Sequence, residues 1–368
     1  MRKKKILFLF SDTGGGHRAP TNAMIQALEA EYPGQYDTQM IDFLRYLPAP
    51  FKNSPELYPS LSRMKAIWKV SYESMNGPVR SRAATQIAYP YVRKAITRLL
   101  DDNPADMIVS VHPLSNAMIP RVLKKNPIPF ITMVTDLVST HVFWYSTRSD
   151  MIIVPTVQAK NRGIRLGIPA QRMQVVGLPV SQTFNAVTES KEDIKKQLGW
   201  DGLTVLLVGG GDGMGPVRKV ARAINDSGLP ISLAVVCGRN ESLLEDLHSL
   251  NWKIPHHLYG FVSDMPQYMT AADIFVTKAG ANSVSEAFIC GLPTIIYSYL
   301  PGQEVGNVDY VLDGGAGTYA ATPTQVVEDI RTLVDDDAAR EKMAAASLAL
   351  ARPDASRDIV RLLAQQLS

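Results

Sequence analysis

The stretch ILFLFSDTGGGHRAP, residues 6–20, contains the pattern on which the fold prediction rests. Five apolar residues predict a buried strand, three glycines let the backbone turn tightly, and Pro20 favours the first turn of a helix. A strand that runs through a glycine-rich loop into a helix is typical of a βαβ unit in a parallel sheet. The start of that helix would favour an oxygen anion.

The same alternation of apolar runs and amphipathic stretches continues along the chain. The strands predicted in the first half are 6–10, 38–41, 107–111, 130–134 and 151–154. Those predicted in the second half are 204–208, 231–236, 257–259, 274–277 and 294–297. We therefore predict an α/β fold with two Rossmann-like, doubly wound parallel sheets that face a central cleft, where ligands bind at the carboxyl ends of the strands.

The length of 368 residues predicts two domains. We expect a linker near 178–187 to separate an N-terminal domain, 1–183, from a C-terminal domain, 184–353. A last helix, 354–368, is expected to complete the N-terminal domain. The two cysteines form no disulfide or metal pattern, which favours a reducing compartment. No stretch approaches the roughly 20 apolar residues of a membrane-spanning helix, so we expect a protein that is soluble or lies on a membrane.

Charge is distributed unevenly between the two halves. Residues 1–187 contain 23 Lys and Arg against 12 Asp and Glu, whereas residues 188–368 contain 15 against 23. One interpretation is an ordinary solvated surface. The other is that the first half binds an anionic partner, either nucleic acid or a phospholipid surface.

The segment 45–98 interrupts the alternation of strands and helices. It is rich in Pro, Tyr and Met, and only Glu56 and Glu73 oppose its cations. Cations mixed with aromatic residues suit a membrane interface, a nucleic-acid surface, or a helical subdomain with a basic outer face. The interleaved cations include Arg63, Lys65, Lys69, Arg80, Arg82, Arg93 and Lys94.

His17 is the candidate catalytic residue of the first loop. It would lie at the positive end of a helix, where the dipole disfavours the imidazolium form. A neutral imidazole can accept a proton, as a general base acting on a hydroxyl must. Gly15 and Gly16 would let a ligand approach the backbone closely. The alternative is a turn histidine with no catalytic role.

The same loop also matches a dinucleotide fingerprint. Gly14, Gly16 and Ala19 have the required spacing, and Asp42 ends the next strand, as a ribose-binding acid would. Asp42 lies further along the chain than the usual distance of about 20 residues. This pattern would indicate an NAD(P)-dependent oxidoreductase.

A second glycine loop, GGGDGMGP at 209–216, follows the predicted strand 204–208. It is not a dinucleotide fingerprint in register, and it lacks the Gly-Lys-Ser/Thr ending of a P-loop. The loop could instead form a nest for a diphosphate or nucleotide.

Two polar segments follow later strands. Ser283 and Glu286 have capping-box spacing, but the same helix start could hold a phosphate while Glu286 accepts hydrogen bonds from a ribose. Beyond them, Gln303, Glu304 and Asn307 place amide and carboxylate groups where they could bind the hydroxyls of a sugar.

Taken in order, segments 11–18, 209–216, 278–287 and 302–307 resemble the monogalactosyldiacylglycerol synthase branch of the GT-B glycosyltransferases. That branch is similar to the lipid II-forming N-acetylglucosaminyltransferase and to processive diacylglycerol glucosyltransferases. The resemblance covers most of the chain. It implies an inverting transfer, without a metal or other cofactor, from a UDP-sugar to the free hydroxyl of diacylglycerol.

The resemblance also implies roles for individual residues. His17 resembles the catalytic base and Glu286 the glutamate on the uridine ribose, while His141 and Trp144 lie in a stretch that departs from the plant-type pattern. The implied acceptor-side residues are Gly15, Gly16, His112 and Asp136. The implied residues for the diphosphate, uracil, ribose and donor sugar are Gly211, Asp212, Gly213, Phe261, Val262, Lys278, Gly280, Ser283, Glu286, Gln303, Glu304 and Asn307.

We therefore predict a hexosyltransferase that favours galactose over glucose. Its expected partners are a UDP-sugar, diacylglycerol and an anionic phospholipid surface bound by the basic first domain, with no nucleic acid. The expected location is cytoplasmic and peripheral to a membrane. The alternatives are an NAD(P)-dependent oxidoreductase, a transferase with another lipid acceptor such as a polyprenyl-linked sugar, and a non-catalytic basic module.

Overall fold

The structure is a computed structural model that describes residues 2–13, 15–123, 127–213 and 215–367. The chain forms two compact units. Unit 1 comprises Met1–Gln182, Leu300–Glu304 and Asp354–Ser368, and unit 2 comprises Thr183–Tyr299 and Val305–Pro353. The boundary at Gln182 lies in the expected linker, and the last helix groups with unit 1 as expected. The continuous second domain that we expected is interrupted, because Leu300–Glu304 groups with unit 1.

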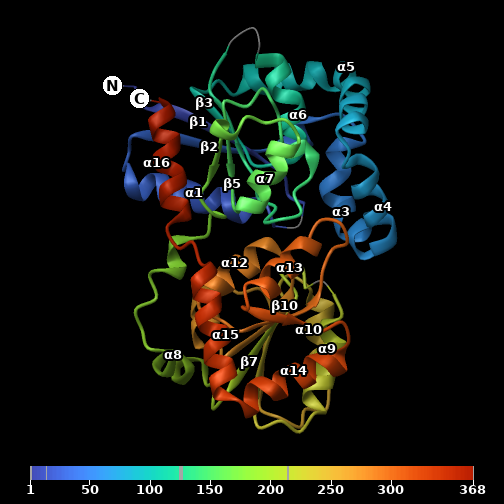
Figure 1. The fold of residues 1–368 in the computed structure, drawn as a ribbon, viewed down its shortest axis with the longest axis vertical. Helices are drawn as coiled ribbons and strands as arrows, with labels where there is room; N and C mark the ends of the chain where they lie inside the picture. Colours follow the sequence, from blue (N-terminus) through green and yellow to red (C-terminus); the bar gives the residue numbers. More distant parts are fainter. Residues whose placement is uncertain (1, 14, 124–126, 214, 368) are drawn as a thin grey trace. The chain divides into compact units, whose positions relative to one another are not determined.

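Unit 1 contains a parallel sheet that, in the described part of the chain, has six strands in the order β2-β1-β3-β4-β5-β6 (Figure 1). Its central strands are apolar and buried along their length, as expected where helices cover both faces. Two carboxylates fix strand starts, since Asp106 accepts from the Lys5 N–H and Asp150 from the Phe130 N–H. The strands are β1 (Lys4–Phe10), β2 (Tyr36–Asp42), β3 (Met107–Ser110), β4 (Phe130–Met133), β5 (Met151–Val154) and β6 (Met173–Val175).

The helices of unit 1 include one from the far end of the chain. In Figure 1, α16 (Ala355–Leu367) lies beside α1 (Arg18–Glu31), and its Ile359 and Leu363 join the core that β1 forms with α1. Short 3-10 turns lie at Phe51–Asn53, Val142–Trp144 and Ala170–Arg172. The other helices are α2 (Phe43–Tyr46), α3 (Ser54–Arg63), α4 (Lys65–Met75), α5 (Pro78–Asp102), α6 (Pro113–Val122) and α7 (Val157–Arg165).

The segment between β2 and β3 is helical. It consists of α2, α3, α4 and α5 with one short 3-10 turn, so the predicted insertion 45–98 forms most of a group of helices in unit 1. The longest of these helices, α5, contributes Val92, Ile96 and Leu99 to the core and leaves its other side exposed. The side chain of Arg63, one of the predicted cations, lies outside the described residues.

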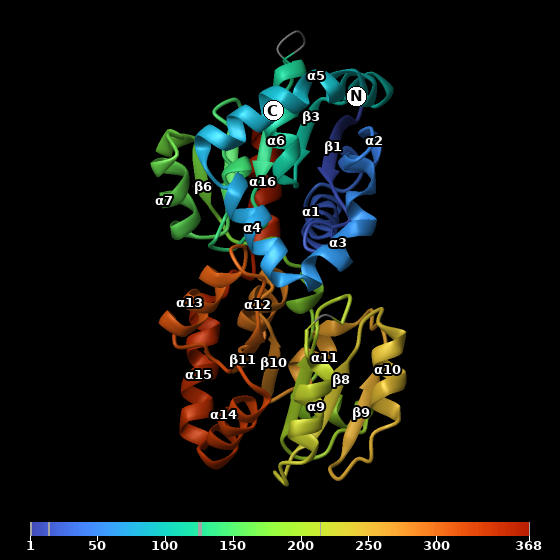
Figure 2. The ribbon, with the colours of Figure 1, turned by 90° about the vertical axis from the view of Figure 1, so that its right-hand side faces the viewer.

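Unit 2 repeats the architecture with a parallel sheet in the order β12-β11-β10-β7-β8-β9 (Figure 2). Asp273 accepts from the Thr204 N–H at the start of β7 and pairs with Lys191 and Lys195. The strands are β7 (Thr204–Val208), β8 (Ser232–Val236), β9 (His256–Tyr259), β10 (Ile274–Lys278), β11 (Thr294–Ser298) and β12 (Gly317–Tyr319). The helices are α8 (Lys191–Leu198), α9 (Val217–Asn225), α10 (Glu241–His248), α11 (Met265–Ala271), α12 (Ala281–Ile289), α13 (Val305–Asp313), α14 (Pro323–Asp335) and α15 (Asp337–Leu350), with a short 3-10 turn at Gln182–Phe184.

The predicted fold class, two doubly wound parallel sheets, is confirmed. The ten predicted strands are present, each within two residues of its expected ends, and β6 and β12 were not predicted. Among the described residues, no helix combines the length and the apolar character needed to cross a bilayer.

Candidate functional site

Each sheet reverses its strand order at one point. In unit 1, β1 lies between β2 and β3, and in unit 2, β7 lies between β8 and β10. Ligands of open α/β sheets bind beyond the carboxyl ends of the strands at such a reversal. The predicted residues lie on loops and helix starts that follow β1, β3 and β4 in the sheet of unit 1 and β7, β9, β10 and β11 in the sheet of unit 2, so they lie at the carboxyl edges of the two sheets.

His17 precedes α1 and is buried in unit 1. Its backbone carbonyl accepts from the N–H and the hydroxyl of Thr21, which anchors it to the first turn of the helix. Its Nδ1 lies 2.9 Å from the hydroxyl oxygen of Thr135, just beyond β4. Burial lowers the pKa of His17 to about 4, against a smaller opposite effect of the Val111 carbonyl, so the ring is neutral at pH 7.

His112 immediately precedes α6 and lies beside His17. The centroids of the two imidazole rings lie 5.0 Å apart in an edge-to-face arrangement. Burial, and then the neighbouring His17, hold the pKa of His112 well below its ordinary value, so this ring is also neutral. Its buried Nδ1 has no hydrogen-bond partner in the described part of the chain.

Asp136 is a buried carboxylate at the same edge. It accepts a hydrogen bond of 2.6 Å from the indole Nε1 of Trp144 and one of 3.1 Å from the amide Nε2 of Gln303. Burial raises the pKa of Asp136, although both hydrogen bonds act in the opposite direction. Trp144, whose role the sequence left open, therefore holds Asp136 in place, and Gln303, which was predicted on the donor side, contacts Asp136 within unit 1.

His141 has a structural position. Its Nδ1 accepts from the Phe143 N–H, and its ring packs edge-to-face against Tyr72 of α4. The Tyr72 hydroxyl donates to the Ser139 carbonyl, and Asn76 accepts from the Val142 N–H. These bonds fix the loop after β4 to the helical insertion.

The glycines of the first loop leave space for a ligand. A side chain added at Gly15 or Gly16 would meet no other atom within 4 Å, although Gly15 has a φ of +69° that disfavours one. Gly14, part of the dinucleotide pattern, lies outside the described residues. Asp42, the predicted ribose acid of that pattern, instead accepts from the N–H groups of Asp12, Leu44 and Arg45, so its carboxylate serves the local backbone.

In unit 2, the loop after β7 is tightly folded. The Gly213 N–H donates to the Gly210 carbonyl, and a Cβ at Gly213 would lie 2.4 Å from the Cys237 carbonyl oxygen. Gly211 and Asp212 form the outer turn. The Lys278 side chain reaches this loop from β10, since its Cε lies 3.3 Å from where a Cβ at Gly210 would be. Met214 lies outside the described residues.

The helix start after β10 differs from the capping-box interpretation. Gly280, not Ser283, precedes α12, and no side chain caps the helix there. Ser283 is the third residue of the helix, so it cannot form a capping box with Glu286. The first N–H groups of α12 have no partners within the helix and are suited to an anion.

Glu286 lies one turn further along α12 and is partly buried. Desolvation raises the pKa of Glu286 to about 7. Within the described part of the chain, its carboxylate accepts no hydrogen bond that would compensate for this desolvation. An uncompensated carboxylate of this kind is suited to a ligand that donates hydroxyls.

The remaining predicted residues follow two other strands of unit 2, β9 and β11. Phe261, after β9, is 59% exposed, whereas Val262 packs against the core of unit 2. Asn307 donates from Nδ2 to the Ala279 carbonyl, which ties α13 to the loop before α12. Glu304 is buried in unit 1, and its carboxylate accepts from the Leu300 N–H.

Some of the buried polar atoms that lack a partner in the described part of the chain lie at these two edges. Such atoms destabilise a fold unless something satisfies them, and a bound ligand is one source of partners. In the described part of unit 1 they include Ser11 Oγ, His112 Nδ1 and Gln303 Oε1. In the described part of unit 2 they include Thr277 Oγ1, Asn282 Oδ1 and Asn307 Oδ1. Sequence reasoning assigned no individual role to the hydroxyls of Ser11, Thr135 and Thr277; their common signal is a hydroxyl at the end of a buried strand or just beyond it.

Comparison with known proteins gives matches along the whole chain. Residues 17–180 match the family model described as monogalactosyldiacylglycerol (MGDG) synthase, and residues 204–359 match the glycosyltransferase family 28 C-terminal domain. The chain is 34% identical over 374 residues to the probable monogalactosyldiacylglycerol synthase, chloroplastic, of Glycine max, which covers 98% of this chain and 71% of that protein.

Solved structures share the fold. The crystal structure of Acinetobacter baumannii MurG has a TM-score of 0.60 at 17% identity, covering 98% of this chain and 99% of that one. The UDP-GlcNAc 2-epimerase from Neisseria meningitidis bound to UDP-GlcNAc has a TM-score of 0.63 at 15% identity, covering 98% and 100%. Identities this low establish the architecture, which is that of GT-B proteins, and leave the reaction to the site.

Proposed function

Because the chain belongs to the monogalactosyldiacylglycerol synthase family, we propose that it transfers a hexose from a UDP-sugar to the free hydroxyl of diacylglycerol. Galactose is the favoured sugar and glucose the alternative, since the relatives are named for galactose. The product would be a glycosyl-diacylglycerol. The transfer would invert the configuration at the anomeric carbon and use no metal or other cofactor.

The observation that carries the proposal is the state of His17. A histidine with its pKa at about 4 stays neutral through the physiological range and keeps a nitrogen lone pair for a proton. The Thr135 hydroxyl at Nδ1 fixes the orientation of the ring. Gly15 and Gly16 leave the adjoining backbone open to a substrate.

The proposed step is a single displacement. His17 removes the proton from the diacylglycerol hydroxyl while that oxygen attacks the anomeric carbon of the sugar. The bond between this carbon and the diphosphate breaks, and UDP leaves with the electron pair. The N–H groups at the start of α12 and the charge of Lys278 would stabilise the negative charge on the leaving group.

Unit 2 supplies the groups for the nucleotide. Glu286 would accept hydrogen bonds from the ribose hydroxyls, because its desolvated carboxylate has no protein donor in the described part of the chain. The loop Gly211–Gly213 and Ser283 would bind the diphosphate through backbone and hydroxyl groups. Phe261 offers an exposed ring to the uracil.

Replacement of His17 tests this assignment. The variant His17→Ala should lose glycolipid formation by about 100-fold or more, because the proton acceptor is missing, while UDP still binds to unit 2. The assay is mass spectrometry of lipids after incubation with diacylglycerol and either UDP-galactose or UDP-glucose. Calorimetry with UDP is the parallel measurement.

A matched control is available on α10. His248 is exposed and is the last residue of α10, at the end of the helix away from the turn that precedes it, so His248→Ala should keep full activity. Undiminished transfer by His17→Ala would refute the catalytic assignment. Transfer of neither sugar by the unaltered protein would refute the proposed reaction itself.

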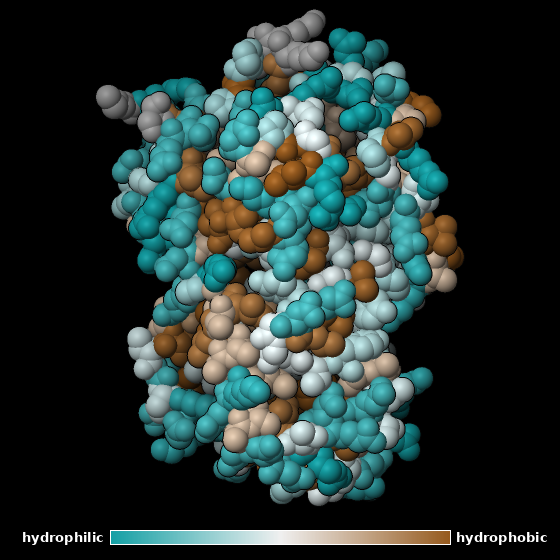
Figure 3. Space-filling view, in the orientation of Figure 1, coloured by the Kyte–Doolittle hydropathy of each residue, from teal (hydrophilic) through white to brown (hydrophobic). Residues whose placement is uncertain are grey.

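We also propose that the helical insertion of unit 1 binds an anionic membrane surface. Along α5, Val79, Ile87 and Tyr91 are 77%, 81% and 58% exposed and share one side of the helix. Figure 3 shows apolar side chains among hydrophilic ones where α4 and α5 reach the surface. The exposed cations Arg80 and Lys94 lie on the same helix. Apolar groups beside cations suit lipid chains beneath anionic headgroups.

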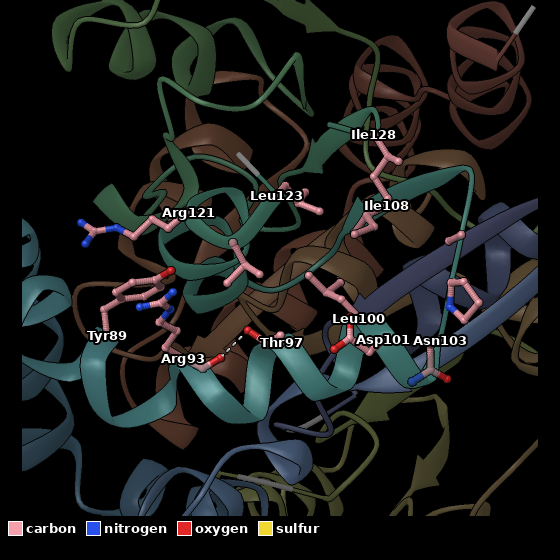
Figure 4. A pocket seen from close by; sticks show the side chains of 13 residues that line it. Tyr89, Arg93, Thr97, Leu100, Asp101, Asn103, Ile108, Arg121, Leu123 and Ile128 are labelled. Carbon is pink, nitrogen blue, oxygen red and sulfur yellow. Dashed lines mark hydrogen bonds between the residues drawn. The ribbon is translucent and has the colours of Figure 1, made fainter. Parts of the chain in front are cut away.

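Two hollows next to α5 fit this proposal. One, of about 260 Å³, is lined by Arg82, Arg121 and Arg148, none of which forms an ion pair among the described residues. The other, of about 600 Å³, is shown in Figure 4, where Arg121 and Tyr89 lie at one end beside Arg93 and apolar residues such as Ile128 line its wall. Unpaired guanidinium groups suit the phosphate of a lipid headgroup.

A further inference from the structure

Arg239 lies in a turn whose backbone is fixed against the glycine loop of unit 2. The turn follows β8, and its Arg239 N–H donates to the Gly211 carbonyl at 2.9 Å. The Asn240 side-chain amide donates to the Gly213 carbonyl at 3.3 Å. Gly238 has no room for a side chain, because a Cβ there would lie 2.3 Å from the Gly211 oxygen. These contacts fix the backbone of Arg239 beside the glycine loop, so its side chain begins next to Gly211.

The guanidinium of Arg239 is close to the loop but weakly engaged. Its side chain is 61% exposed, and Nη1 lies 3.8 Å from Oδ1 of Asp212, an ion pair that contributes little at such exposure. The same Nη1 is 3.7 Å from where a Cβ at Gly211 would be. The guanidinium carbon lies 4.6 Å from the centre of the Phe261 ring. The guanidinium therefore lies near both the glycine loop and the Phe261 ring.

The loop needs cations if it binds a diphosphate. Backbone N–H groups and a helix start supply only partial positive charge, whereas a nucleoside diphosphate carries at least two full negative charges. Among the described residues, two cationic side chains approach this loop: Lys278 from β10 and Arg239 from β8. They stand on opposite sides of β7, because β7 lies between β10 and β8 in the sheet.

We propose that Arg239 binds the diphosphate of the nucleotide sugar, leaving Asp212 and forming paired hydrogen bonds with phosphate oxygens. A planar guanidinium is suited to this contact. The inference rests on the proposed function, because it names a further residue for the same donor. It also assigns a cation to the charge that develops on UDP as the sugar leaves.

The test compares UDP with uridine, which lacks the phosphates. In the full-length chain, Arg239→Ala should weaken UDP binding by about 10- to 100-fold and leave uridine binding within about twofold of the unaltered protein. Arg239→Lys should give an intermediate UDP affinity, because an ammonium keeps the charge but loses the paired geometry. Asp212→Asn should leave UDP affinity equal or higher, because the competing carboxylate is gone. Calorimetry and NMR titration supply the affinities.

Arg222 on α9 gives the control, because it is an exposed arginine whose one ion pair among the described residues is with Asp226, just after the helix. Arg222→Ala should change neither affinity. Unchanged UDP binding by Arg239→Ala would overturn the inference. An equal loss of affinity for UDP and for uridine would also overturn it, because Arg239 would then contact the uracil base together with Phe261. If Arg239→Ala also lowers the melting temperature, the loss of UDP affinity could come from a destabilised fold. Arg239→Gln tests this, because glutamine keeps most of the aliphatic part of the side chain, and it must show the same selective loss of UDP affinity. Absence of UDP binding by the unaltered protein would refute the proposed function together with this inference.

Discussion

Glu286 combines a partly buried carboxyl group with the absence of a protein donor in the described part of the chain. Desolvation raises the pKa of Glu286 to about 7, so the carboxyl is largely protonated below that pH. Ribose hydroxyls would bind the ionised form. We therefore expect uridine affinity to rise by about tenfold or more between pH 5.5 and 8 and to level off above the pKa. NMR titration measures it, and uridine is used because it has no phosphate that titrates in this range.

Two variants sharpen this measurement. Glu286→Gln should bind uridine more weakly than the unaltered protein at pH 8 and show no pH dependence, because it cannot ionise. Glu245→Gln, at an exposed position on α10, should keep the full pH dependence. A pH dependence that survives in Glu286→Gln would assign the titration to another group.

Single residues differ in how far the sequence predicts them. The neutral state of His17 was predicted from its place before a helix, but the cause of its lowered pKa is burial, which a sequence does not display. Its partner Thr135 lies 118 residues away and is brought close by the order of β1, β3 and β4 in the sheet. The spacing of Ser283 and Glu286 left a capping box open as an alternative, but α12 starts after Gly280, which places Ser283 inside the helix.

At the scale of elements, α16 has a large predicted effect on stability. Its Leu363 is fully buried in the core formed with α1 and β1, whereas Arg361 is half-exposed and pairs with Glu31. We expect Leu363→Ala to lower the free energy of unfolding of unit 1 by about 2–5 kcal/mol through the cavity it leaves. Arg361→Ala should lower it by about 1 kcal/mol or less, because exposed ion pairs contribute little.

Tryptophan fluorescence can assign this loss to unit 1. Trp68 and Trp144 belong to unit 1, and Trp200 and Trp252 to unit 2. In a background with Trp200→Phe and Trp252→Phe, chemical denaturation followed by fluorescence reports unit 1 alone. Equal losses for the two α16 variants would show that α16 is held by charge and not by its apolar face.

Strands were predicted where apolar runs are long enough to be buried on both faces. Thr204–Val208 and Met151–Val154 were predicted to the residue for this reason. Two edge strands escaped prediction. β6 has two exposed residues out of three, and β12 begins with Gly317, so neither shows a run of buried apolar side chains. Their pairing with β5 and β11 comes from the sheet and not from their own sequence.

At the scale of the whole chain, the distribution of charge could be predicted from the sequence, but the grouping of distant segments into one unit could not. The basic and acidic halves are visible in the sequence and correspond closely to unit 1 and unit 2. The grouping of Leu300–Glu304 with unit 1 depends on contacts such as the hydrogen bond from Gln303 to Asp136, 167 residues apart. No local pattern encodes a contact across such a distance. A domain boundary drawn by sequence order therefore assigned Leu300–Glu304 to the second domain, whereas its contacts group it with unit 1.

Membrane binding tests the charge asymmetry on the full-length chain. In a vesicle flotation assay, we expect the protein to bind and float with vesicles of phosphatidylcholine and phosphatidylglycerol. It should not float with vesicles of phosphatidylcholine alone. Raising ionic strength from about 0.1 M to about 0.5 M should weaken binding, because the Debye length falls from about 10 Å to less than half of that. Each cation near an anionic surface contributes about 1 kcal/mol. The double variant Arg80→Glu, Lys94→Glu on α5 should therefore bind at least tenfold more weakly.

The control reverses the same amount of charge in unit 2. Lys219 on α9 and Arg331 on α14 are exposed, and Lys219→Glu with Arg331→Glu changes the net charge of the protein by the same amount as the α5 variant. If binding depends on the surface formed by α4 and α5, the control should retain its vesicle affinity. Equal losses in both double variants would mean that the vesicle responds to the overall charge of the protein. Undiminished binding to neutral vesicles at high salt would exclude electrostatic docking and leave the exposed apolar side of α5, with Val79 and Ile87, as the remaining attachment to the bilayer.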